Sequence, residues 1–160
     1  MDEGRQKTAP IELIESASTL TLATSDDTGP WAAPVYYAFL DGNFYFFSSP
    51  QSRHIQQASE SGKAAASVFH QADSWQEIRG IQMTGTVRRI RSIPLSLQVI
   101  AAYLKRFPFT REFFPRHPSP DAEAFFSRFK ARLYAFCPTE AYYIDNRLGF
   151  GNRQPINPIS

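Results

Sequence analysis

The sequence predicts an α+β protein, mostly β, in which an antiparallel sheet curls into a closed or partly closed barrel. Apolar and polar residues alternate in "TLTLAT" (19–24), which is the spacing of a strand with one buried face. The pair Asp41-Gly42 separates two aromatic runs and is a strong hairpin signal. Helical spacing is confined to a few short segments. Many strands around a small core favour closure, because closure removes unpaired strand edges.

The first half of the chain predicts helices at both ends of a group of strands. Pro10 and the residues after it, "IELIESAS", predict a short helix that begins at the proline. Residues 31–49 form two strands joined by the hairpin turn, and Pro34 indicates an edge or a bulge in the first of them. Residues 51–60 predict a second helix, which Gly62 ends.

The second half predicts strands at 63–71 and 78–90, and then a helix at 94–107. Gly80 and Gly85 mark points of bending or close approach in the longer strand. The buried stripe of the helix is expected to consist of Leu97, Ile100, Ala101 and Leu104.

Two closing strands are expected within 132–146, broken at Pro138-Thr139, and the tail from Arg147 onward predicts no regular element. The aromatic run "RFPFTREFFP" (106–115) is too apolar to lie wholly in water. We therefore expect this run to pack on the barrel or to cover a ligand cleft.

Composition predicts one domain over residues 1–160 and excludes several classes of function. The chain is 42% hydrophobic and 14% aromatic, which is incompatible with general disorder. A net charge of +2 argues against nucleic-acid binding, and Cys137 alone gives no disulfide framework. No apolar run approaches the roughly 18 residues of a membrane span, and no secretory signal is evident. We expect a cytoplasmic protein that binds neither nucleic acid nor membrane.

The junction "SSPQSRH" (48–54) predicts a phosphate site where a strand meets a helix. Ser49 suits the N-cap position and Pro50 the first helical position, which leaves first-turn amides at the positive end of the helix dipole. Ser48, Ser52, Arg53 and His54 add hydroxyl and cationic groups to those amides. The alternative interpretation is a well-capped surface helix whose arginine is merely solvated.

Two strands near this junction have the residue types of a site for a flat heteroaromatic ring. The first carries Trp31, Tyr36 and Tyr37, and the second carries Gln82 beside its two glycines. Planar side chains, hydrogen-bonding groups and gaps for backbone approach suit a ring with a phosphate tail. Alternatively, the aromatic residues belong to the core and the glycines relieve strand curvature.

Taken together, the segments "PVYY", "FFSSPQSRH" and "IRGIQMTGTV" resemble the pyridoxamine 5′-phosphate oxidase-like FMN-binding split-barrel superfamily. The ending "YYIDNRLGFG" (142–151) is similar to that of its YhbP-type branch, and the resemblance covers about residues 10–155. It implies a six- or seven-stranded antiparallel split β-barrel with peripheral helices, a homodimer, and FMN in clefts at the subunit interface.

The resemblance also implies roles for individual residues. Arg53 matches the family's phosphate-binding arginine, and His54 stands where the oxidases usually have a lysine. Phe47 and Ser48 lie along the flavin ring and ribityl chain, with Ser49 and Ser52 near the phosphate. Trp31 to Tyr36 edge the ring. Gly80 stands where the oxidases offer a glutamine from the partner subunit, so Gln82 is the nearby candidate to replace it.

The resemblance favours an FMN-dependent oxidoreductase acting on a small-molecule redox substrate, with no catalytic side chain identified. The arginine-rich C-terminal motif of true pyridoxamine phosphate oxidases is missing, so vitamin B6 oxidation is not expected. The alternative is a non-catalytic split-barrel module that binds heme, a deazaflavin or a protein partner, since His54 and His70 offer imidazoles for iron. No metal site is expected from the scattered histidines. The "LGFG" tail is hypothesised to fold over the flavin as a lid.

Overall fold

The computed structural model describes residues 3–113, 127, 130–156 and 159 of the chain. Its helices are α1 (Glu3–Ser16), α2 (Arg53–Ser61) and α3 (Ile93–Arg106), with short 3₁₀ helices η1 (Trp75–Glu77), η2 (Pro108–Phe113) and η3 (Asn146–Leu148). Its strands are β1 (Thr19–Asp26), β2 (Gly29–Tyr36), β3 (Ala38–Leu40), β4 (Asn43–Ser48), β5 (Ala64–Phe69), β6 (Arg79–Arg89), β7 (Arg132–Asp145) and β8 (Arg153–Pro155).

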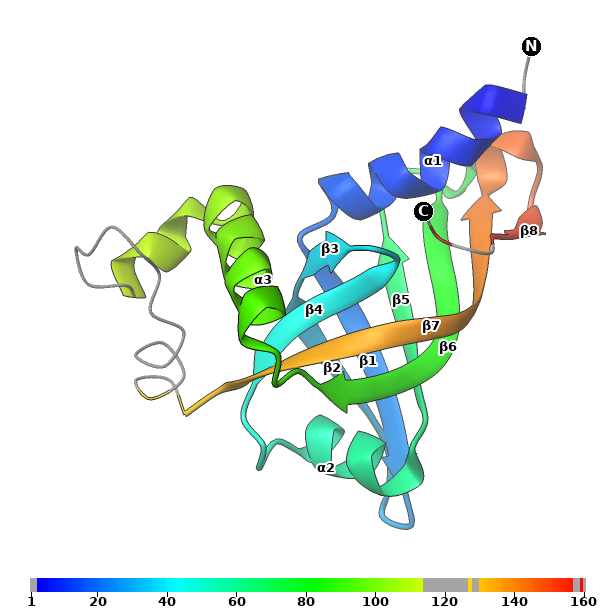
Figure 1. Ribbon diagram of the computed structural model, residues 1–160. Coiled ribbons are helices and arrows are strands. Elements are labelled where there is room, and N and C mark those ends of the chain that lie inside the picture. The colour runs from blue at the N-terminus through cyan, green and yellow to red at the C-terminus, as the bar shows by residue number, and fades with distance from the viewer. Residues whose placement is uncertain (1–2, 114–126, 128–129, 157–158, 160) are drawn as a thin grey trace.

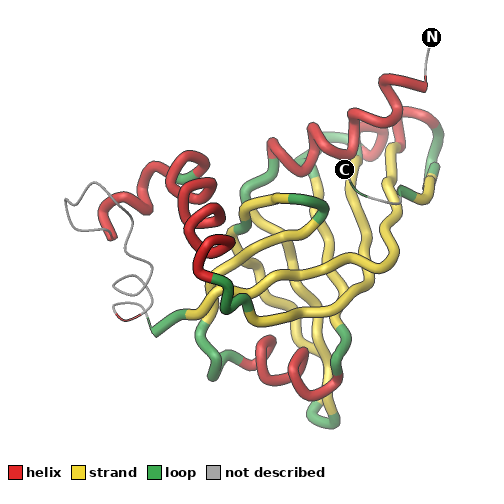
Figure 2. The backbone as a smooth tube through the Cα atoms, in the orientation of Figure 1, coloured by secondary structure: helices red, strands yellow, loops and turns green. Residues whose placement is uncertain are grey.

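The strands form one antiparallel sheet that curls into a split barrel, as the sequence predicts (Figures 1 and 2). The strand order is β2-β1-β5-β6-β7-β4-β3, and β8 pairs with β7. The hairpin turn between β3 and β4 is confirmed, with Asp41 and Gly42 at φ 48° and 75°. Two positive φ values in succession are those of a type I′ turn, whose twist matches that of the strands. Pro34 lies on the edge strand β2, where a missing N–H removes no ladder bond.

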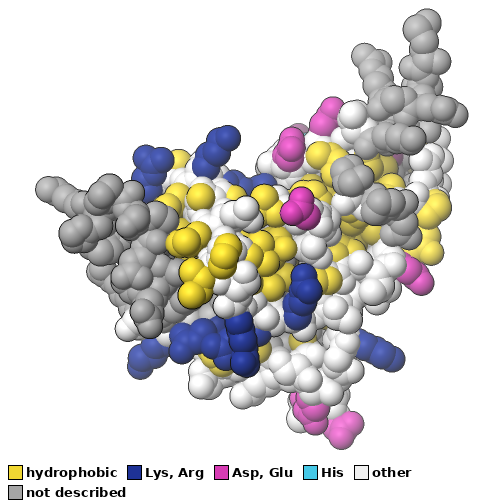
Figure 3. Space-filling model, viewed as in Figure 1, with side chains coloured by type: hydrophobic (Ala, Val, Ile, Leu, Met, Phe, Trp, Pro, Cys, Tyr) yellow, Lys and Arg dark blue, Asp and Glu magenta, His cyan; other side chains and the backbone are white. Residues whose placement is uncertain are grey.

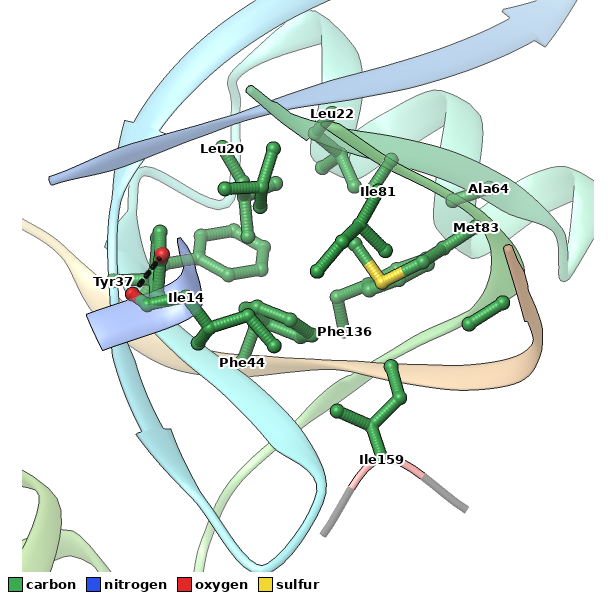
Figure 4. Packing of buried hydrophobic residues seen from close by; sticks show 14 of the residues in the cluster. Ile14, Leu20, Leu22, Tyr37, Phe44, Ala64, Ile81, Met83, Phe136 and Ile159 are labelled. Carbon is green, nitrogen blue, oxygen red and sulfur yellow. Dashed lines mark hydrogen bonds between the residues drawn. The ribbon is translucent and has the colours of Figure 1, made fainter. Parts of the chain in front are cut away.

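The barrel is filled by the inward faces of its strands and is covered at its two ends by helices. Alternate residues of β1 point inward, and Leu20 and Leu22 are fully buried. They meet Phe44, Ile81 and Phe136 from other strands (Figure 4). At one end α1 inserts Ile14, whose carbonyl accepts a 2.6 Å hydrogen bond from the Tyr37 hydroxyl. At the other end α2 inserts Ile55, so α1 and α2 lie at opposite ends of the barrel (Figure 1).

A second apolar cluster lies between α3 and the outer side of β3, β4 and β7. The predicted stripe on α3 is partly wrong: Ile100 is buried, but Leu97 and Ala101 are exposed and Leu104 is only half-buried. Its buried side also includes Val99 and Tyr103, because Tyr103 packs on Phe47 and donates to the Tyr36 carbonyl. Among the helices of the described residues, none has the length and apolar character needed to cross a bilayer.

Several boundaries differ from the prediction, and the strand expected before the hairpin is divided into β2 and β3 at Tyr37. Helix α1 begins seven residues before Pro10 and contains it, and the tail adds β8. The strand β7 continues through Pro138 with a β-bulge: Glu140 pairs with Thr84 and Pro138 with Gly85, so Thr139 is the extra residue of β7. Gly85 faces the carbonyl of Cys137 so closely that any Cβ would overlap it, so the predicted close approach is confirmed.

The aromatic run and its neighbours are only partly described. Phe107 is buried under α3, and Phe109 is about half exposed against Phe107 and Tyr36. Phe114 and His117 lie outside the described residues.

Candidate ligand-binding site

The junction between β4 and α2 forms a turn before the helix begins. The helix was expected to start at Pro50 with Ser49 as N-cap, but it starts at Arg53 and its N-cap is Ser52. The Ser52 amide and hydroxyl both donate to the Ser49 carbonyl, at 3.0 and 2.7 Å. Because the Ser52 side chain is turned back in this way, it does not cap the first-turn amides. The Ile55 amide donates to the Ser52 carbonyl at 3.1 Å, so the amides of Arg53 and His54 are the two in the first turn that remain available to an external acceptor.

Two serine hydroxyls and one imidazole converge beside this turn. The Ser48 Oγ lies 2.8 Å from His54 Nε2 and 3.0 Å from Ser52 Oγ, which is itself 3.3 Å from His54 Nε2. The Ser52 proton is already committed to the Ser49 carbonyl. A proton on His54 Nε2 lets all three contacts hold, with Ser48 donating to Ser52, so we assign this tautomer. Burial lowers the pKa of His54, so the ring is neutral near pH 7.

Arg53 lies on the other side of the helix start, against the β1–β2 turn. Its Nη2 donates to Thr28 Oγ1 at 3.1 Å, and its guanidinium carbon lies 4.7 Å from the centre of the Trp31 ring. Within the described part of the chain, Arg53 forms no ion pair with a carboxylate. The residue as a whole is half-buried, and its guanidinium keeps donors that the bond to Thr28 does not use. It can therefore bind an anion without first breaking a salt bridge.

A buried glutamine fixes α2 against the same turn. Gln57 is 1% exposed, and its amide group donates to Asp26 Oδ1 and to the Gly29 carbonyl, both at 3.0 Å. Its carbonyl accepts a 2.7 Å bond from the Thr24 hydroxyl. Bonds from Thr28, Gln57's amide and the nearby Arg53 charge lower the pKa of Asp26, the Thr28 hydroxyl contributing most. This contact between α2 and the β1–β2 turn was not among the features predicted from the sequence.

The strand ends beside the junction add positive charge. Arg132 on β7 pairs directly with Ser48 on β4, and Arg89 on β6 pairs with Tyr134 of β7. Directly paired residues share one face of a sheet, so these cationic residues and Ser48 lie at the same end of the barrel's inner face. Figure 3 shows Lys and Arg side chains in a row over the start of β7 and the end of β6. This charge favours an anionic ligand.

The structure brings six of the predicted site residues together and places the other three elsewhere. The first group is the α2 cluster, which consists of Trp31, Ser48, Ser49, Ser52, Arg53 and His54. Phe47 packs edge-on against Tyr103 under α3, with ring centres 4.9 Å apart. Tyr36 contacts Phe107 on the same side. Gln82 is exposed on the outer face of β6, and His70 is exposed beyond the end of β5.

The "LGFG" tail does not cover the α2 cluster of its own chain. It follows β7 at the end of the barrel opposite α2 (Figure 1). The strand β5 starts three residues after α2 ends and leads to η1, which contacts the tail through Trp75 and Phe150. One strand length therefore separates the tail from α2, and a lid within one chain is excluded by this arrangement.

Comparison with known proteins identifies relatives of the chain. The sequence model of the family described as "Pyridoxamine 5′-phosphate oxidase" matches residues 10–139. A UPF0306 protein of Klebsiella pneumoniae is 29% identical over 142 residues, 88% of this chain and 85% of that protein. The UPF0306 protein YhbP of Salmonella paratyphi C is 32% identical over 125 residues, 77% of this chain and 74% of that protein.

Solved structures share the fold at low sequence identity. A conserved hypothetical protein of Mycobacterium tuberculosis has a TM-score of 0.69 at 17% identity and covers 100% of this chain and 95% of its own. The heme storage protein HutZ of Vibrio cholerae has a TM-score of 0.64 at 16% identity, covering 81% and 87%. An FAD-binding protein of Mesorhizobium loti has a TM-score of 0.61 at 17% identity, covering 82% and 88%.

Proposed function

We propose that this chain, which belongs to the pyridoxamine 5′-phosphate oxidase family and its YhbP-type branch, binds FMN and acts as a flavin-dependent oxidoreductase. The observation that carries the proposal is the α2 cluster. It combines the first-turn amides of Arg53 and His54 with a guanidinium that forms no ion pair among the described residues. Beside them lie two hydroxyls and a neutral imidazole, whose bonds to one another a phosphate would have to replace. These are the donors that a phosphate monoester dianion requires.

The residues of the α2 cluster fit the phosphate end of FMN. Arg53 and the first turn of α2 would hold the phosphate, and Trp31 stacks against Arg53 and positions its guanidinium. When bound, FMN supplies the hydride and electron chemistry on a small-molecule substrate. The chain's own residues bind and orient it, and Gln57 holds the phosphate-binding helix at a fixed distance from Trp31.

A homodimer is part of the proposal, and an uncharged outer face of the sheet supports it. Four adjacent strands present only small, polar or aromatic residues there, in three cross-strand rows. The face consists of Tyr36, Thr19, Phe69 and Gly80, then Pro34, Thr21, Ser67 and Gln82, then Ala32, Ala23, Ala65 and Thr84. Depletion of charge marks the centre of protein interfaces. Gln82 on this face reaches a flavin only in a second subunit.

Heme is the second candidate, because the HutZ neighbour is described as a heme storage protein. The geometry of His54 does not favour it. The Nε2 of His54 is hydrogen-bonded to Ser48 and Ser52, and iron would have to displace these bonds to use it. His70 is exposed and lies outside the α2 cluster. A deazaflavin or a protein partner would use the same cluster or the outer face, respectively.

Titration of the purified protein with FMN, followed by flavin fluorescence, tests the proposal. Arg53→Ala is expected to weaken binding by at least about tenfold, because a hydrogen bond to a charged group contributes roughly 1.5–3 kcal/mol. Arg111→Ala, at an exposed arginine outside the cluster, is the matched control. Equal affinity in the two variants, or no binding at micromolar FMN, would refute the proposal. An absorption spectrum after hemin addition distinguishes the heme alternative.

A further inference from the structure

Helix α3 has one apolar side that packs on the barrel and a second apolar side that faces solvent. The first side includes Val99 and Tyr103, which are buried against β3, β4 and β7. The second side is the outward ridge, which consists of Ile93, Leu97, Ala101 and Leu104 at helical spacing. Ile93 is 70% exposed and Leu97 40%. A helix that is apolar on all sides is normally buried on all sides, so the outward ridge indicates a further contact.

Cationic residues lie at both ends of the outward ridge. Arg88 and Arg91 are exposed shortly before α3 begins, and Lys105 and Arg111 are exposed where it ends. Residues 78–111 contain no Asp or Glu, although the chain as a whole has a net charge of only +2. Figure 3 shows the apolar side chains over α3 between two groups of Lys and Arg side chains. Positive charge is therefore concentrated on the side of the molecule that carries the ridge.

The outward ridge and the other proposed surfaces lie on different parts of the barrel. Helix α3 covers the outer side of β3, β4 and β7, whereas the uncharged outer face belongs to β2, β1, β5 and β6. The α2 cluster lies at one end of the barrel, and α3 lies along its flank (Figure 1). A contact at the ridge therefore leaves both the proposed homodimer face and the proposed FMN site free.

The distribution of charge on the ridge indicates what covers it. Both ends of the ridge are cationic, so a second copy would oppose like charges in either orientation. A partner helix needs a groove, but α1 and α2 lie at the ends of the barrel and neither runs along α3 (Figures 1 and 2). An anionic bilayer needs no groove: apolar side chains enter the acyl boundary while Lys and Arg remain among the phosphates.

We propose that the outward ridge of α3 adsorbs to the surface of a bilayer that contains anionic phospholipids. Ile93 and Leu97 enter the acyl boundary, and the cations at the two ends of the ridge bind headgroup phosphates. The sequence predicts no membrane partner because it has no run long enough to span a bilayer. An interfacial helix needs no such run, so this proposal departs from that expectation. The contact is reversible and weakens with salt, which screens the charges.

Co-sedimentation with vesicles tests the apolar part of the contact. One set of vesicles contains equal parts of phosphatidylcholine and phosphatidylglycerol, and the other contains phosphatidylcholine alone. The double variant Ile93→Ser/Leu97→Ser is expected to bind the anionic vesicles at least about tenfold more weakly than the wild type, because two apolar side chains no longer leave water. The matched control is Ile78→Ser/Leu148→Ser, at residues 45% and 54% exposed elsewhere, and it should bind like the wild type. Circular dichroism checks that both variants are folded.

A second pair of variants tests the charged part at constant net charge. Arg91→Gln/Lys105→Gln removes one cation from each end of the ridge, and Lys63→Gln/Arg153→Gln removes two exposed cations elsewhere. Each cation near an anionic surface contributes roughly a factor of five to adsorption, so the first pair should weaken binding at least about tenfold. The second pair should bind nearly as the wild type does, and binding to phosphatidylcholine alone should be weak.

The outcomes separate this proposal from its rivals. A wild-type protein that binds neither set of vesicles overturns it. Equal losses in the ridge variants and their controls mean that adsorption is not directed by α3, which also overturns it. Loss of self-association in Ile93→Ser/Leu97→Ser, without vesicle binding by the wild type, means that a second copy covers the ridge. FMN titration of the same variants should match the wild type, so failure of the FMN proposal leaves the membrane contact standing and the reverse also holds.

Discussion

Gln57→Met tests whether the buried amide is what fixes α2 to the β1–β2 turn. Methionine has nearly the same length and helix propensity as glutamine, so the change removes hydrogen bonds without opening a large cavity. It removes three bonds, to Thr24, Asp26 and Gly29. At about 0.5–1.5 kcal/mol net for each bond, the expected loss in free energy of unfolding is about 1.5–4.5 kcal/mol.

Urea unfolding measures this loss, and the adjacent exposed Gln56 provides the control. Gln56→Met is expected to stay within about 0.5 kcal/mol of the wild-type protein, as surface changes usually do. For a domain of this size, a loss of about 3 kcal/mol lowers Tm by roughly 6–12 °C. If Gln57→Met is as stable as Gln56→Met, the amide does not fix α2 to the β1–β2 turn and the argument from its three bonds is refuted.

Gln57→Glu is expected to make the free energy of unfolding depend on pH, because the new side chain lies at the contact between α2 and the β1–β2 turn. A glutamate would oppose the Asp26 carboxylate, so the folded-state pKa of the pair would rise above its unfolded value. Below about pH 4 the protonated Gln57→Glu variant is expected to be more stable than Gln57→Met. This difference is lost as pH rises through the raised pKa, because the glutamate then ionises beside Asp26. Unfolding midpoints measured from pH 4 to pH 7 should fall for Gln57→Glu alone. Parallel profiles for the two variants would contradict this.

Three further predictions concern the tail, the bulge and the imidazole. Asp145→Asn should destabilise the fold by about 1–3 kcal/mol at pH 7, because Arg147 Nε donates to the Asp145 carboxylate at 2.9 Å. Because the lowered pKa of Asp145 gives stability that is lost as pH falls, the variant's unfolding should also depend less on pH below about 4. Gly85→Ala should lower the free energy of unfolding by about 2–4 kcal/mol, because the added methyl group overlaps the Cys137 carbonyl. Gly62→Ala is the control: Gly62 has a positive φ but no close neighbour, so this change should lower the free energy of unfolding by only about 1 kcal/mol. FMN binding to the wild type should tighten from pH 7.5 to 5.5 more than in His54→Lys, whose charge is permanent, beyond the shared effect of the phosphate's own titration. Equal slopes would count against His54 at the phosphate.

The fold was predictable because its signals are local. Alternation in β1 and the Asp41-Gly42 turn each depend on a few adjacent residues, and both are confirmed. The errors arise where a distant residue decides. Pro138 was predicted to end a strand. The strand continues there because Pro138 pairs with Gly85 of β6, which lies fifty-three residues earlier in the sequence. The stripe on α3 is rotated because Tyr103 finds Phe47 and the Tyr36 carbonyl as partners.

The same distinction divides the α2 cluster. Ser48, Ser52, Arg53 and His54 are close in sequence, so a strand-to-helix junction was enough to bring them together. Thr28 and Gln57 were not predicted as site residues, because the β1–β2 turn, which contains Thr28, contacts α2, which contains Gln57, only in the folded chain. One signal was available: Gln57 follows Arg53 by four residues and therefore lies on the same helix face. A buried polar residue on that face needs partners, and the nearby "SDDTGP" turn supplies them.

The three predicted residues outside the α2 cluster differ in what they require. Phe47 packs on Tyr103 under α3 within one chain, so its side chain would contribute to a ligand site only after rearrangement of that cluster. Tyr36 contacts the edges of Phe107 and Phe109 but is 51% exposed on the uncharged outer face. Gln82 needs no rearrangement, because it already points outward in the middle of the uncharged face. In the proposed homodimer, a second copy against that face would bring Gln82 to the partner's ligand. Gln82→Ala should therefore weaken FMN binding without changing the stability of the monomer, whereas a site confined to one chain predicts no effect on binding.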